Sequence, residues 1–121
     1  MELKKLPYSL TVCKLLSVAD IDLNAEFYFI GRTADELSLV CLTENAPVHT
    51  TARDDGWRCF RIQGMLDFSL VGILSGITGI LAERGIAVFA ASTYNTDYVL
   101  VKADCFDRAT DALAEAGYTI L

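Results

Sequence analysis

The stretch of residues 64–103 limits the possible folds of this chain more than any other part of it. Five of its apolar residues are spaced as one face of a helix: Leu70, Ile73, Leu74, Ile77 and Leu81. Gly85 follows, where a helix commonly ends. Two runs rich in β-branched and aromatic residues, 86–93 and 97–102, flank the polar turn 94–96. The stretch therefore predicts a loop, a helix and a β-hairpin, in that order.

The remaining segments predict further strands. Apolar or alternating runs indicate strands at 9–16, 27–33, 37–42 and 57–63, after a polar lead-in at 1–8 and with a connector at 44–55. Asp104 is placed to cap a second helix over 105–116, and residues 118–121 complete the pattern as a short strand.

The two halves of the chain share a weak repeat. The segment FIGRTADELSLV (29–40) overlays FAASTYNTDYVLV (89–101) with one residue inserted, although the first half lacks the long helix of the second. The overlay predicts an incomplete first unit, residues 1–55, followed by a complete βαββαβ unit, residues 56–121.

The composition limits the classes of function that this chain can have. The 121 residues are 53% hydrophobic and carry a net charge of −6. This excess of apolar residues fits a sheet covered on both faces or a self-association surface. We expect no nucleic-acid partner, because no basic stripe is visible. We also expect no membrane span, because the longest uncharged run, 68–82, is too short.

Catalytic and metal chemistry find little support. The single histidine, His49, lies in a connector without a nucleophile nearby in sequence. The four cysteines lack metal-ligand spacing, which favours reduced thiols in a cytoplasmic protein, although the even count leaves a disulfide open. We therefore expect a non-enzyme that needs no cofactor and no metal.

Three glycines in the predicted helix, Gly72, Gly76 and Gly79, have two explanations. Each costs about 1 kcal/mol relative to alanine in a helix interior, so each needs a reason. One reason is close approach of the backbone to the sheet or to another helix. The other is that Gly72, near the helix N-terminus, leaves backbone N–H groups open to a ligand carboxylate.

Two segments carry a resemblance to a known family: GWRCFRIQGMLDFSLVGIL (56–74) and FAASTYNTDYVLV (89–101). With them the chain resembles an ACT domain, in particular the ACT repeats of aspartate kinases and the stand-alone arginine-sensor proteins. The resemblance implies an α+β, ferredoxin-like βαββαβ fold with an antiparallel sheet and helices on one face. Residues 1–55 would then be an incomplete N-terminal ACT-like unit.

The resemblance also implies a ligand site between the loop that enters the first helix and the hairpin. On the loop side it implicates Asp67, Phe68, Ser69, Leu70, Val71 and Gly72. On the strand side it implicates Thr93, Tyr94, Asn95 and Asp97, together with Ser92. Asp97 would hold an ammonium or a basic side chain, with the alternatives that it serves only the turn and that Asp67 only caps the helix.

These residues lead to two hypotheses. In the first, the chain is a regulatory protein that binds an amino acid or a similar small metabolite, at an interface of a homodimer, and acts on a separate enzyme. In the second, it is a dimerisation or protein-interaction module with a vestigial ligand site. The sequence leaves the ligand's identity open.

Overall fold

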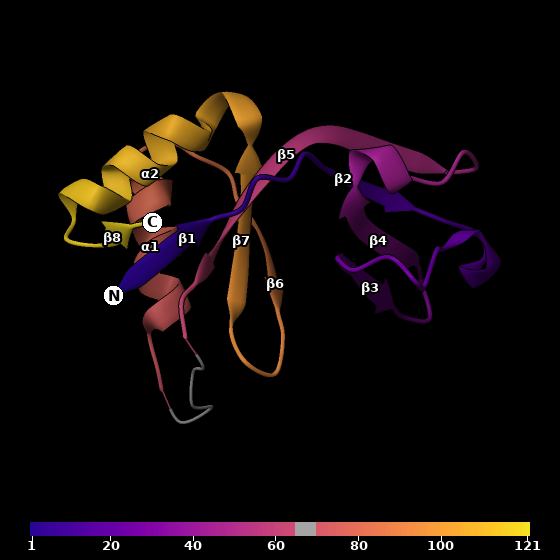
Figure 1. Ribbon diagram of the computed structural model, residues 1–121, viewed down its shortest axis with the longest axis horizontal. Coiled ribbons are helices and arrows are strands. Elements are labelled where there is room, and N and C mark those ends of the chain that lie inside the picture. Colours follow the sequence, from indigo (N-terminus) through magenta and orange to yellow (C-terminus); the bar gives the residue numbers. More distant parts are fainter. Residues whose placement is uncertain (65–69) are drawn as a thin grey trace. The chain divides into compact units, whose positions relative to one another are not determined.

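The computed structural model describes residues 1–64 and 70–121, which form two compact units (Figure 1). The N-terminal unit is Tyr8–Trp57, and the C-terminal unit combines Met1–Pro7 with Arg58–Leu121. The strand β5 (Ala52–Ile62) contributes residues to both. None of the helices formed by the described residues is long and apolar enough to cross a membrane.

The N-terminal unit is built from strands. Its sheet has the order β3-β4-β2-β5, from β3 (Tyr28–Arg32), β4 (Leu37–Leu42), β2 (Leu10–Lys14) and the first part of β5, all antiparallel. Two short 3-10 turns, Val18–Asp20 and Thr43–Asn45, are its only helical segments. The absence of a long helix in this half, expected from the sequence, is confirmed for these residues, all of which are described.

The alternation of residues along these strands fills a small core. Its buried side chains come from β2, from β4 and from the segment after the 3-10 turn: Cys13, Leu15, Ile21, Leu37, Leu39 and Cys41. Because side chains of a strand alternate between faces, every second residue of β4 enters this cluster, whereas β2 contributes Cys13 and is followed by Leu15.

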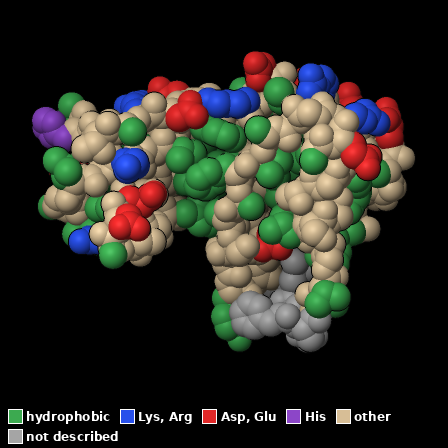
Figure 2. Space-filling model, turned by 180° about the vertical axis from the view of Figure 1, so that it is seen from behind, with side chains coloured by type: hydrophobic (Ala, Val, Ile, Leu, Met, Phe, Trp, Pro, Cys, Tyr) green, Lys and Arg blue, Asp and Glu red, His purple; other side chains and the backbone are tan. Residues whose placement is uncertain are grey.

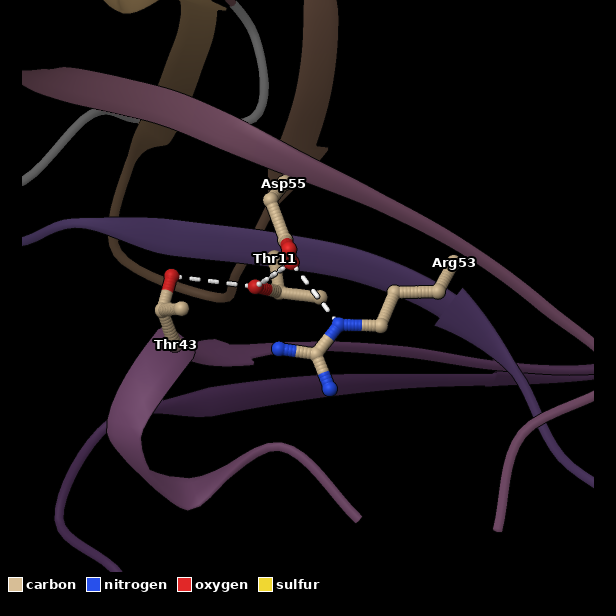
Figure 3. Close-up of polar contacts among 4 residues, drawn as sticks. All are labelled: Thr11, Thr43, Arg53 and Asp55. Carbon is tan, nitrogen blue, oxygen red and sulfur yellow. Dashed lines mark hydrogen bonds and ion pairs between the residues drawn. The ribbon is translucent and has the colours of Figure 1, made fainter. Parts of the chain in front are cut away.

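A polar cluster fixes the first part of β5 to β2 (Figure 3). The carboxylate of Asp55 accepts a hydrogen bond from the Thr11 hydroxyl at 2.6 Å and one from Nε of Arg53 at 2.9 Å. The Thr43 hydroxyl lies 3.0 Å from that of Thr11 and donates to it, because Thr11 has only one proton to give. These bonds lie beside a shift of the β2–β5 register between Leu10 and Val12. The expectation that 44–55 is a connector is therefore wrong from Ala52 onward.

The described residues of the C-terminal unit form five strands in the order β6-β7-β5-β1-β8. They are β6 (Phe89–Ser92), β7 (Asp97–Lys102), the second part of β5, β1 (Glu2–Lys5) and β8 (Thr119–Ile120). Strand β1 is antiparallel to β5 and parallel to β8. The expectation that residues 1–8 are only a polar lead-in is therefore wrong: the first of these residues form a strand of this sheet and pack with the C-terminal unit.

Two helices cover one face of this sheet: α1 (Ile73–Glu83) and α2 (Phe106–Glu115) (Figure 1). Both contribute to one core with alternate residues of β1, β5 and β7: Leu3, Phe60, Ile62, Ile77, Leu81, Val99, Val101, Phe106, Ala109 and Leu113. The guanidinium of Arg58 lies 4.1 Å from the centre of the Phe106 ring, a cation–π contact. The fold is α+β and ferredoxin-like, as the sequence predicts.

Element boundaries around the two helices and β6 also differ from expectation. The helix α1 starts at Ile73, so Leu70 lies before it and is 52% exposed. Helix α2 is preceded by a 3-10 turn, and its N-cap is Cys105; Asp104 therefore does not cap it. Strand β6 begins at Phe89, three residues later than the apolar run.

The glycines of α1 have separate explanations. Gly72 is the N-cap and adopts a left-handed conformation with φ of 79°, which side chains other than glycine rarely accept. A Cβ on Gly76 would lie 3.3 Å from the Tyr118 hydroxyl, so close approach explains this glycine. A Cβ on Gly79 would meet nothing within 4 Å of the described atoms.

Candidate functional site

A cleft of about 350 Å³ opens in the C-terminal unit between the start of α1 and the β6–β7 hairpin. Its described lining residues on the helix side are Leu70, Gly72, Ile73, Leu74 and Ser75, and on the hairpin side residues 92–97. The volume lies within the range of small-molecule sites. The sequence stretch that predicts the helix and hairpin thus also supplies both walls of the cleft.

The helix wall presents backbone N–H groups. The N–H of Gly76 donates to the carbonyl of Gly72 at 3.0 Å and begins the hydrogen-bond ladder of the helix. The N–H groups before it have no partner within the helix, and the N-cap has no side chain to receive one. Together with the helix dipole they make this wall suitable for an anionic group.

The hairpin wall is held in shape by two threonines. The N–H of Thr93 donates to the Thr96 carbonyl at 2.8 Å, and the Thr93 hydroxyl lies 3.1 Å from the same oxygen. The buried Thr96 hydroxyl donates to the carbonyl of Ile62 at 2.8 Å, which fixes the turn to the end of β5. The hydroxyl of Thr93, one of the residues that the resemblance implicates in the site, therefore donates its proton within the turn.

Asp97 is the only charged residue among the described lining residues. It begins β7, is half-buried, and pairs across the hairpin with Ser92. The Ser92 hydroxyl donates to Oδ1 of Asp97 at 2.5 Å. Thr93 and Thr96 close the turn, and the bond between Ser92 and Asp97 joins the two strands beside it. A carboxylate accepts several hydrogen bonds, so Asp97 retains capacity for a further donor such as an ammonium group.

The structure brings together most of the described residues that the sequence singles out. Leu70, Gly72, Thr93, Tyr94, Asn95 and Asp97 all line the cleft. Val71 is 88% exposed and is not among the lining residues. Asp67, Phe68 and Ser69 lie outside the described residues. The sequence does not single out Ile73, Leu74, Ser75 and Thr96, because their helical or turn positions also have a purely structural explanation.

The rest of the described chain offers little chemistry. No group of three or more His, Cys, Asp or Glu residues within 1–64 and 70–121 could hold a metal ion. The cysteines of these residues are free, and burial raises the pKa of the Cys41 thiol to about 11 and that of Cys59 to about 12. Both thiols are therefore protonated at neutral pH and unsuited to act as nucleophiles.

Surface charge is mixed. On the face shown in Figure 2, lysine and arginine side chains lie among aspartate and glutamate side chains and form no continuous basic patch. His49 lines a separate depression of about 330 Å³ in the N-terminal unit, together with Leu16 and Val48.

Two family models match the chain. The model of the ACT domain matches residues 52–115, and a model described as an N-terminal domain matches residues 9–49. Neither describes a catalytic family. No curated protein matches the chain at a significant level.

Solved structures share the fold over nearly the whole chain. A structural-genomics target protein from Agobacterium tumefaciens is 35% identical, with a TM-score of 0.87, over 99% of this chain and 91% of its own. A Vibrio cholerae protein of unknown function, described as a possible transport protein, is 21% identical, with a TM-score of 0.73, over 94% and 88%. The aspartate kinase of Clostridium acetobutylicum is 14% identical, with a TM-score of 0.66, over 94% of this chain and 33% of the kinase.

Proposed function

Because this chain belongs to the ACT domain family, whose members are regulatory domains, we propose that it is a non-catalytic sensor of an amino acid or a similar small metabolite. The ligand binds in the cleft between the start of α1 and the β6–β7 hairpin. Binding changes how the protein associates with a second copy of itself or with a separate enzyme.

The main support for this proposal is that the helix wall and the hairpin wall lie on opposite sides of the cleft. Gly72 to Ser75, at the start of the helix, line a cleft whose other side holds Asp97. An α-amino acid carries a carboxylate and an ammonium on the same carbon. Its carboxylate suits the helix wall, and its ammonium suits Asp97.

The proposal places the site at an interface between two copies of the chain. Apolar side chains at the rim support this placement: Leu70 is 52% exposed and Val71 is 88% exposed. Large exposed side chains of this kind beside a cleft are suited to contact a partner surface. A ligand bound there would alter the affinity between copies, which is how a protein without chemistry of its own transmits a signal.

A thermal-shift screen against the twenty amino acids tests the proposal. A ligand at ~100 times its dissociation constant adds about 2.7 kcal/mol to the free energy of unfolding, which raises Tm by several degrees. We expect Asp97→Asn to abolish the shift. The matched control Asp111→Asn, an exposed carboxylate on α2, keeps it. An equal shift in both variants would show that the ligand binds elsewhere.

The second hypothesis, an interaction module without a ligand, has its own support in the N-terminal unit. Leu16 is 87% exposed and Val48 is 92% exposed, and both line the depression of that unit. A protein that associates with the same affinity with and without every amino acid, and loses association on Leu16→Ser, would favour it over the sensor.

A further inference from the structure

We propose that the N-terminal unit docks a basic, apolar segment of another protein in the depression that Leu16 and Val48 line. The proposal adds a partner surface to the proposed function. It holds whether or not a ligand controls the docking, and its test needs no ligand. All residues of this unit are described, and six of them line the depression: Leu16, Asp20, Val48, His49, Thr50 and Thr51.

The depression gathers aliphatic side chains that are open to solvent. Leu16 is 87% exposed and Val48 is 92% exposed. Val18 is exposed as well, and it begins the 3-10 turn that ends at the lining residue Asp20. Single exposed aliphatic residues are common on protein surfaces, but several of them around one depression of about 330 Å³ favour a contact site.

The backbone beneath these side chains is held in place. Leu16 follows Leu15, which is buried in the core of the unit. The N–H of Thr51 donates to the carbonyl of Lys14 at 2.9 Å, which ties the segment after Val48 to the end of β2. A surface that is ordered before a partner arrives loses less conformational entropy on binding. The exposure of Leu16 and Val48 is therefore a feature of a fixed surface.

The charge of the chain is concentrated in the same unit. Its residues include eight aspartates and glutamates and three lysines and arginines, a net charge of −5 with His49 counted as neutral. The C-terminal unit has eight and seven, a net charge of −1. Asp20 places part of the negative charge in the depression itself. Electrostatic attraction therefore favours a basic partner, whereas repulsion opposes a second copy of this unit, a nucleic acid or an anionic membrane.

These features define the chemistry of the partner. An aliphatic or aromatic side chain covers Leu16 and Val48, and burial of this apolar surface supplies most of the affinity. A lysine or arginine beside it pairs with Asp20 and adds a smaller, salt-dependent contribution. The partner is therefore a protein segment in which apolar and basic residues stand close together.

Fluorescence anisotropy of three labelled peptides with the full chain tests the proposal. The peptides alternate lysine with leucine, lysine with serine, or glutamate with leucine. We expect the lysine–leucine peptide to bind at least about tenfold more tightly than either of the others, with an affinity that falls as salt is added. Equal binding of the lysine–leucine and lysine–serine peptides would show attraction of charge alone and overturn the proposal. No binding of any peptide would overturn it too.

Matched variants test the place of docking. Leu16→Ser and Val48→Ser change exposed side chains, so the fold should persist, and each should weaken binding of the lysine–leucine peptide about tenfold. Leu23→Ser, at a leucine that is 61% exposed and lies outside the lining, should leave it unchanged. Asp20→Asn should weaken it about two- to fivefold more than Asp35→Asn, which removes the same charge from the exposed turn between β3 and β4. Equal effects within either comparison would contradict docking in the depression.

Two measurements on the chain alone test other occupants of the depression. Sedimentation equilibrium detects a second copy, and flotation with phosphatidylcholine vesicles detects a membrane. Self-association that is lost in Leu16→Ser would assign the depression to a second copy, and vesicle binding that is lost in this variant would assign it to a lipid surface. Either result would overturn the proposal of a basic protein partner.

Discussion

Two glycines of the same helix should respond in opposite ways to the same substitution. Gly72 is the N-cap of α1 and has a φ of 79°, whereas Gly79 lies in the helix interior. Among the described residues, alanine at position 72 meets no steric obstacle, because the nearest atom beyond its chain neighbours would be the Ser75 hydroxyl oxygen at 3.9 Å. The cost of Gly72→Ala is therefore purely conformational, about 1–2 kcal/mol for a left-handed residue that carries a Cβ.

Gly79→Ala should have the opposite sign. The new Cβ meets no described atom within 4 Å, and alanine is favoured over glycine in a helix interior by about 1 kcal/mol. We thus expect the free energies of unfolding of the two variants to differ by about 2–3 kcal/mol, with the wild type between them.

Urea denaturation followed by far-UV circular dichroism measures both values on the full chain. A Gly72→Ala variant as stable as the wild type would refute the left-handed N-cap. A loss of stability in Gly79→Ala would refute the open environment of this residue. If that loss depended on protein concentration, it would show that this face of α1 packs against a second copy.

Three further predictions concern stability. Burial raises the pKa of the Cys59 thiol from 9.0 to about 12, so the thiol loses its proton at lower pH in the unfolded state than in the folded state. The free energy of unfolding should therefore be unaffected by this group below pH 9 and should fall by roughly 4 kcal/mol as the pH rises towards 12. Alkaline denaturation should show a smaller fall in Cys59→Ala. Thr96→Val leaves a buried carbonyl without its donor and should cost about 1–3 kcal/mol, while a chemical denaturation curve identical to the wild type would contradict the bond. Leu3→Ala removes a side chain with no exposed surface and should lower the free energy of unfolding by about 2–5 kcal/mol. Lys4→Ala, on the opposite face of β1, should lower it by less than about 1 kcal/mol. Equal effects of the two substitutions would contradict the packing of β1.

The elements with a strong internal pattern were predictable. The apolar stripe of α1, the strand β7 and the helix α2 each carry their signal in consecutive residues, so the local sequence suffices. The α+β class and the lack of a long helix in Tyr8–Trp57 follow from the same patterns.

Elements whose existence depends on distant partners were not predictable. Strand β1 has a single buried residue, Leu3, and forms because β5 and β8 offer edges on both of its sides. The first part of β5, Ala52–Gly56, is exposed throughout and is held by the bonds of Asp55 and Arg53 around Thr11. Neither segment has an alternating pattern of its own to reveal it.

The candidate site also has features that the sequence predicts and features that it does not. The resemblance and the polar turn indicate Asp97 and its neighbours, but the sequence does not show that Ser92 donates to Asp97 or that Thr93 is engaged in the turn. Ile73 and Leu74 belong to the apolar stripe, and a stripe alone cannot show that part of it lines a cleft instead of the core. Their position at the first turn of α1, beside the hairpin, makes this difference.

The sequence by itself determined the α+β class and the order of helix and hairpin, because periodicity and turn chemistry act over a few neighbouring residues, while its resemblance to ACT domains indicated the family. The tertiary structure decided that residues 2–5 join the sheet of the C-terminal unit, that the ladder of α1 begins at a left-handed Gly72, and that the helix start and the hairpin enclose a cleft. These features depend on strand pairing and packing between residues far apart in the chain, and such contacts leave no periodic signal in the sequence.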